Sequence, residues 1–227
     1  MGADARVVVP GFPEGEFVHT GDHSRNYRIA VARPEAGRPA LLHVVKRGEG
    51  EFVLHGQERG VGATRETLPN LYSPQGDCEA RLLLPVNATH VKVQSKGDEP
   101  LSWSMRMLPL GEAAVFTGEH LGERSDVLYR SDAMPGLFEV EVDAEDGWNW
   151  ELSFVCDHQL CGSLYVDSLC WKCREITVRE AERMGTDLKD WLEGSGEDGG
   201  RFFLPTSGLI TFVSESNCQW SVRAARL

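Results

Sequence analysis

Two tetrapeptides decide the fold: Trp103-Ser104-Met105-Arg106 and, 117 residues later, Trp220-Ser221-Val222-Arg223. Two other blocks recur in the same order. Arg81-Leu82-Leu83-Leu84-Pro85 returns as Arg201-Phe202-Phe203-Leu204-Pro205 at an offset of 120, and a Thr-Gly-acid-His motif ending at His23 returns 97 residues later, ending at His120. Matching blocks in a preserved order predict an internal repeat. We therefore expect two homologous domains, residues 1–110 and 111–227.

The change of offset from 97 to 120 places 23 extra residues inside the second domain, upstream of Arg201. These extra residues fall within a Cys-rich and helical segment, about residues 155–200, which contains four of the six cysteines and is called the insertion below. The first domain has no equivalent segment.

Short apolar runs bounded by Gly, Pro and Asp predict β-strands in both domains. Leu137-Phe138-Glu139-Val140-Glu141-Val142 alternates with a period of two, which is typical of a strand with one buried face. Strands of this length, separated by turn residues, favour antiparallel sandwiches. The predicted fold class is all-β, with two tandem antiparallel β-sandwich domains.

Each predicted domain closes with a Leu-Pro turn, an alternating strand, a polar turn and the Trp-Ser-x-Arg strand. This ending resembles the closing hairpin of bacterial pre-peptidase-type and calpain C2-like β-sandwich repeats. The resemblance covers about the last 25 residues of each domain and implies the sandwich fold. It carries over no ligand residues.

Net charge restricts the partners. The 227 residues carry a formal charge of −12, and residues 111–227 hold 22 acidic and 10 basic side chains, whereas residues 1–110 hold 13 of each. This balance argues against binding to nucleic acid or anionic membranes. The acidic half serves either solubility or docking of a protein partner.

No signal peptide or membrane-spanning run is evident, so we expect no membrane insertion and a cytoplasmic protein or part of an assembled particle.

The insertion contains the pattern with the most chemistry. Cys156, Cys161, Cys170 and Cys173 form a C-x4-C and a C-x2-C pair, and four thiolates suit the tetrahedral coordination of Zn²⁺. Because protein ligands would fill all four positions, we predict a structural zinc ion. Disulfides or unpaired thiols are the alternatives, and His158 can replace one of the first two cysteines.

A short helix follows the cysteines. Thr177-Val178-Arg179-Glu180 matches a capping box, and apolar residues at helical spacing continue to a stop at Gly194. We predict a helix over about residues 178–193, with a break possible at Gly185-Thr186.

No nucleophile motif, P-loop, zinc-protease motif or dinucleotide fingerprint occurs in the sequence. We therefore predict a non-catalytic adaptor or structural component of a multi-protein assembly, such as a virion or similar particle. The alternative is a carbohydrate- or ligand-binding sandwich in which aromatic residues stack on the ligand, namely Trp148, Trp150 and Trp171. Two minor alternatives are a hydrolase that uses His23 or His120, and a calcium site at Asp143–Gly147, whose other interpretation is a solvated turn.

Overall fold

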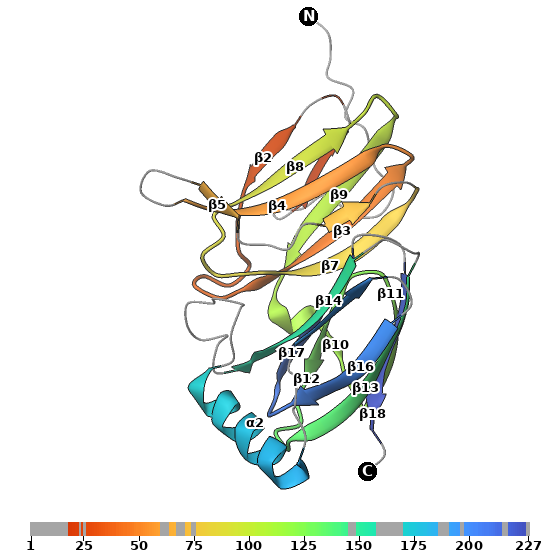
Figure 1. Cartoon of the computed structure of the whole chain (residues 1–227). Helices are drawn as coiled ribbons and strands as arrows, with labels where there is room; N and C mark the ends of the chain where they lie inside the picture. The colour runs from red at the N-terminus through yellow and green to blue at the C-terminus, as the bar shows by residue number, and fades with distance from the viewer. Residues whose placement is uncertain are drawn as a thin grey trace, which may run out of the picture. The chain divides into compact units, whose positions relative to one another are not determined.

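The computed structural model describes residues 18–22, 24, 26–59, 64–66, 71–73, 76–144, 149–157, 170–185, 191–195, 198–214 and 218–225. It is built mainly from β-strands in four sheets (Figure 1), so the predicted all-β class is confirmed. The chain divides into two compact units, Met1–Leu110 and Gly111–Leu227. Independent folding of the two stays a prediction.

Unit 1 contains two sheets. The first has the order β1 (Val18–Asp22), β9 (Leu101–Leu108), β3 (Ala40–Gly48), β7 (Cys78–Leu84). The second has the order β2 (Tyr27–Ala30), β8 (His90–Lys96), β4 (Glu51–Arg59), β5 (Thr64–Glu66), with β6 (Leu71–Ser73) also paired to β4. The sheets meet around Trp103, whose buried ring contacts Tyr27 edge-on and Phe52.

Unit 2 also contains two sheets. One has the order β11 (Glu119–Glu123), β18 (Cys218–Ala224), β13 (Gly136–Ala144), β16 (Asp198–Leu204). The other has the order β10 (Ala114–Val115), β12 (Asp126–Arg130), β17 (Gly208–Ser214), β14 (Asn149–Cys156), β15 (Trp191–Ser195). Only the short β10–β12 pairing is parallel among the strand pairs of the described residues. A single 3-10 turn (Leu110–Glu112) precedes β10.

The core of unit 2 draws on both sheets, which makes the unit a β-sandwich. Phe138 and Trp220 come from one sheet, and Phe154 and Phe212 come from the other. The rings of Phe212 and Trp220 stack with centroids 4.5 Å apart. Stacked aromatic side chains bury much apolar area and fix the distance between the two layers.

The two units share one strand order. In each, an early strand (β1 or β11) pairs with the carboxyl-terminal strand (β9 or β18), which pairs in turn with a nine-residue strand (β3 or β13). The duplication that the sequence predicts would produce this correspondence. Common ancestry of the units stays a prediction.

A glycine opposite a tryptophan recurs in both units. Gly21 lies opposite Trp103 in the β1–β9 pair, and Gly122 lies opposite Trp220 in the β11–β18 pair. A Cβ atom on either glycine would collide with the ring of its tryptophan. The tryptophan ring therefore leaves room only for glycine at the position opposite it on the neighbouring strand.

This contact corrects the alignment of the Thr-Gly-acid-His motif. Because Gly122 occupies the place of Gly21, the counterpart of His120 is His19, at an offset of 101 rather than 97. His23 lies outside the described residues. Both motifs contain a Gly followed by an acid, so letter matching alone selected the wrong register.

Helix α2 (Trp171–Met184) differs from the predicted helix over 178–193. It starts seven residues earlier, at the N-cap residue Cys170, and ends where Gly185 adopts a left-handed conformation with φ of 65°. The hydroxyl of Thr177 donates to the carbonyl of Cys173 inside the helix, so it does not cap the amino terminus. Val178 is 52% exposed and so lies outside the inward face of the helix, whereas Ala181 and Met184 are partly buried. No helix in the described part of the chain is long and apolar enough to span a membrane.

Candidate metal centre

The first thiol of the candidate site belongs to Cys156, the last residue of β14. Its strand partner is Gly208 of β17, and its side chain is fully buried in the core of unit 2. The next residue, Asp157, accepts hydrogen bonds from Ser207 Oγ at 2.6 Å and from the Tyr129 hydroxyl at 3.2 Å. These bonds fix the direction in which the chain leaves the sheet.

The other two thiols stand at the start of α2. Cys170 is the N-cap residue and makes no side-chain capping hydrogen bond. Cys173 follows in the first turn and is 0% exposed. Residues three apart at a helix start lie on the same side of the helix. The C-x2-C pair therefore directs both thiols toward the sheet from a helix, not from the hairpin of a zinc ribbon.

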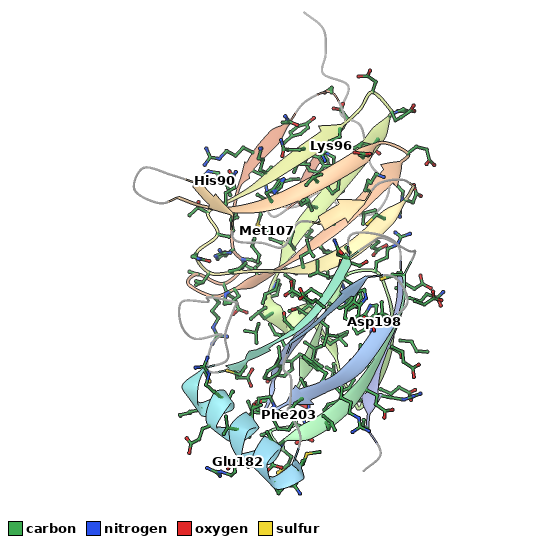
Figure 2. All side chains as sticks on the ribbon, viewed as in Figure 1. His90, Lys96, Met107, Glu182, Asp198 and Phe203 are labelled. Atoms are coloured by element: carbon green, nitrogen blue, oxygen red, sulfur yellow. The ribbon has the colours of Figure 1, made fainter. Side chains whose placement is uncertain are left out.

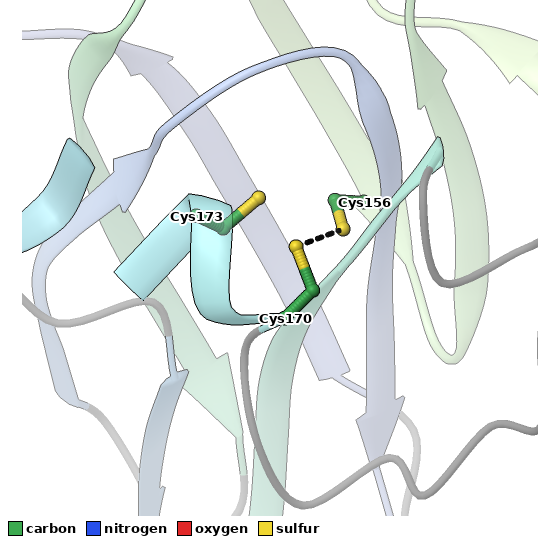
Figure 3. Close-up of side chains that lie close together, drawn as sticks. All are labelled: Cys156, Cys170 and Cys173. Carbon is green, nitrogen blue, oxygen red and sulfur yellow. Dashed lines mark hydrogen bonds between the residues drawn. The ribbon is translucent and has the colours of Figure 1, made fainter. Parts of the chain in front are cut away.

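The structure brings the three thiols together (Figure 3). Their Sγ atoms lie within 4.8 Å of one another, and the Cys156 thiol donates to Cys170 Sγ at 3.3 Å. The three cysteines are free thiols, and a separation of 3.3 Å is well beyond the ~2.05 Å of a disulfide bond. The cluster combines one residue that ends a strand with two that begin a helix 14 positions later.

The donor set fits a zinc ion. Two thiolates at ~2.3 Å from a tetrahedral zinc ion lie roughly 3.8 Å apart; the Sγ atoms of Cys156 and Cys170 are 3.3 Å apart, and all three Sγ atoms lie within 4.8 Å of one another. Within the described residues, this is the only group of three or more Cys, His, Asp or Glu ligand atoms that are close enough to share one ion. Thiolates select zinc and other soft ions over magnesium and calcium.

Two electrostatic effects at the site act on thiolate formation in opposite directions. A hydrogen bond with Cys156, burial, and a hydrogen bond with Cys170 raise the pKa of the Cys173 thiol. The amino terminus of α2, which has no acidic residue in its first turn, supplies a partial positive charge that stabilises thiolates. A metal cation would add the larger compensating charge and release the thiol protons.

The fourth predicted ligand, Cys161, lies outside the described residues, as do His158 and the rest of residues 158–169. Asp157 is close in sequence, but its carboxylate is engaged by Ser207 and Tyr129. The structure thus places three of the four predicted ligands at one point. Cys161 as the fourth stays a prediction.

The other candidate residues from the sequence have structural roles where they are described. Trp150 is 3% exposed and packs against Phe212, so its ring is inaccessible to a sugar. Trp148 and the Trp171 side chain lie outside the described residues. Burial lowers the pKa of His120, whose ring contacts Trp220 and whose Nε2 lies 4.0 Å from the Asp126 carboxylate.

Sequence reasoning missed two arginines that bind backbone carbonyls, the buried Arg130 and the half-buried Arg33. Arg130 donates to the carbonyls of Thr206 and Met134 at 3.0 and 2.5 Å in unit 2. Arg33 donates to three carbonyls in unit 1, those of Pro85, Val86 and Ala88. Each arginine donates to a carbonyl at or just after a Leu-Pro turn, Leu84-Pro85 or Leu204-Pro205. These two turns belong to the repeated blocks of the sequence, so the repeat contained a signal for the contact.

No family profile and no curated protein matches the chain. Similar solved structures include the STIV MCP, a viral capsid protein, at 9% identity over 91% of this chain and 95% of that chain, with a TM-score of 0.18. A structure of Sulfolobus Turreted Icosahedral Virus matches at 9% identity over 92% and 90%, with a TM-score of 0.19. A candidate secreted protein from Parabacteroides distasonis matches at 10% identity over 96% and 93%, with a TM-score of 0.22. TM-scores this low carry no argument about function.

Proposed function

We propose that this chain is a non-catalytic β-sandwich protein that presents surfaces to protein partners in a multi-protein assembly, such as a virion or similar particle. The supporting observation is that the large apolar side chains exposed among the described residues all lie in one unit. All four such residues belong to unit 2, namely Val115, Leu121, Met134 and Val178. The same unit holds the whole acidic excess of the chain. An excess of one charge sign steers and aligns a partner of the opposite sign, and a bound partner gains by covering exposed apolar side chains.

The second part of the proposal is a structural zinc ion held by Cys156, Cys170, Cys173 and Cys161. The convergence of the first three thiols at 3.3 to 4.8 Å supports it. When bound, the ion would supply three or four strong bonds between the end of β14 and the start of α2. With every position filled by a side chain, no water-binding position remains for catalysis.

The residues of this site have a mechanical task. Cys156 is fixed by the core, and Cys170 and Cys173 begin the helix, so linking them fixes the insertion against the sandwich. Burial of Cys156 and Cys173 excludes water and protects the thiols from oxidants. The site would stabilise unit 2 and the surface that it presents.

The assembly role is tested by size-exclusion chromatography of a native extract from the source, followed by immunodetection of the chain. We expect the chain to elute well above the position of the purified single chain, and to shift to that position in high salt. Elution as a single free chain at low salt would contradict the assembly role. Elemental analysis of the reduced, purified protein should give about one zinc per chain.

A further inference from the structure

The outer face of the β11-β18-β13-β16 sheet in unit 2 contains a hollow of about 680 Å³. Four of its lining residues are carboxylates, and none is a lysine or arginine. Leu121 lines it as well, with 78% of its surface exposed. The acidic residues that line the hollow are Glu123, Glu141, Asp143 and Asp198.

Strand register explains the hollow. Leu121, Ser221, Glu141 and Gly199 lie opposite one another in one row across the four strands. Residues directly opposite each other point to the same face of a sheet. Ser221 has a short side chain and Gly199 has none. The surface of the sheet is therefore lower at these two positions of the row than at Leu121 and Glu141. A Cβ at Gly199 would collide with the carbonyl of Val140, so the low floor is set by strand packing.

The charge in the hollow is only partly balanced. Arg223 donates to Glu141 Oε1 at 2.8 Å from the neighbouring row. In the part of the chain that the structure describes, no ion pair involves Glu123, Asp143 or Asp198. Asp198 lies at the edge of the hollow, because it pairs with the buried Val142 and its carboxylate lies near Gly194 of β15; Figure 2 labels it at the start of β16. Uncompensated carboxylates on an exposed face attract cations.

A single metal ion is not the cation that this face fits. Among the described residues, only the three thiols bring three ligand atoms within sharing distance of one ion. The carboxylates are instead spread along the strands. Glu141 and Asp143 are two residues apart on β13, which separates them by roughly 7 Å along one face. A ligand with several positive charges at that spacing matches them.

The equivalent face of unit 1 is different. Val45 and Ser104, the counterparts of Glu141 and Ser221, are only 3% and 1% exposed. Arg47 occupies the position of Asp143, so the charge there is reversed. The open acidic face is therefore specific to unit 2.

Resting on the proposed assembly role, we propose that this face docks an extended basic segment of a partner protein. Lysine or arginine at alternate positions of an extended chain recurs every ~7 Å and reaches the carboxylates in turn. The alkyl stem of one of these lysine or arginine side chains covers Leu121. The partner is recognised by this pattern of charge and spacing.

The test uses the full chain and a fluorescein-labelled peptide, (Lys-Ser)5, with (Glu-Ser)5 as the charge control. Fluorescence anisotropy should show binding of the lysine peptide alone, weakened about tenfold between 50 and 300 mM NaCl. The triple variant E123Q/E141Q/D143N, which neutralises the lining carboxylates that lie on the outer face, should weaken binding at least tenfold. The matched variant E112Q/E175Q/E182Q removes three exposed carboxylates elsewhere, including Glu182 on α2 (Figure 2), and should bind like the wild type.

Leu121→Ser gives an uncharged check on the same face, and should weaken binding without changing its salt dependence. Equal binding by the two triple variants would overturn the proposal. So would self-association of the chain that the E123Q/E141Q/D143N variant abolishes, because the occupant would then be a second copy. If the peptide fails to bind while the chain still elutes in a complex from native extract, the docking surface is wrong and the assembly role stands. Peptide binding with a free chain in the extract would support the docking surface and contradict the assembly role.

Discussion

Replacing Cys170 by serine removes one ligand from the proposed zinc site and leaves the core side chains in place, because Cys170 is only partly buried. Zinc that binds only the native state at a free concentration 1000-fold above its Kd stabilises by about 4 kcal/mol. For a unit of 117 residues, this corresponds to roughly 12–20 °C in the midpoint of thermal unfolding. The serine hydroxyl stays protonated at neutral pH and is a poor zinc ligand, so the variant should lose most of that increment.

The assay is differential scanning calorimetry of the full chain with and without EDTA. Chelator should lower the unfolding midpoint of wild-type unit 2 and leave that of the Cys170→Ser variant unchanged. Cys218→Ser is the matched control, because Cys218 is buried in the same unit away from the cluster. It should lose stability through packing and keep its response to EDTA. An unchanged wild-type midpoint in EDTA, with no zinc in the purified protein, would refute the reasoning.

Three further predictions concern the sandwich itself. Arg130→Met removes the buried guanidinium that donates to the carbonyls of Thr206 and Met134 and should lower the free energy of unfolding by about 1.5–3 kcal/mol in urea titrations; a loss below 0.5 kcal/mol would contradict this. Gly122→Ala forces a methyl group into the ring of Trp220 and should cost about 1–3 kcal/mol, whereas Gly111→Ala, which meets no neighbouring atom, should be nearly neutral. Burial lowers the pKa of His120 below 6.5, so the unfolded state binds more protons and stability should fall as pH drops below about 6.5; His120→Gln should reduce that fall, and an identical pH profile would show that this ring does not contribute.

The strand pattern was predictable because a strand with one buried face has apolar and polar residues in alternation. The alternation over Leu137–Val142 corresponds to buried Phe138, Val140 and Val142 in β13. The paired Trp-Ser-x-Arg strands also match, as β9 and β18. These signals are local, so a sequence shows them directly.

The helix bounds and the motif register were wrong for reasons that are not local. Thr177 matches a capping box in sequence, but its hydroxyl has a partner one turn earlier within the helix. The real start, Cys170, is a residue without strong capping preference, and its position follows from contact with Cys156. The register of His120 depends on a contact between Gly122 and Trp220, which are nearly 100 residues apart.

The candidate site was predicted in composition more than in geometry. The spacing of four cysteines indicated a metal, and three of them converge. The elements that carry the thiols, a strand end that faces a helix start, were not predicted. Thiol spacing limits which residues can meet, whereas the elements that carry them are set by the sandwich.

The most direct test of the account is the coordination of zinc in the purified, reduced full-length protein, measured by X-ray absorption at the zinc edge. The account predicts about one zinc per chain, surrounded by sulfur at ~2.3 Å, with close to four sulfur ligands. Replacement of Cys170 by serine should reduce the zinc content sharply. A protein without zinc, or a zinc ion bound only through nitrogen and oxygen, would contradict the claim that Cys156, Cys170 and Cys173 form a structural metal centre.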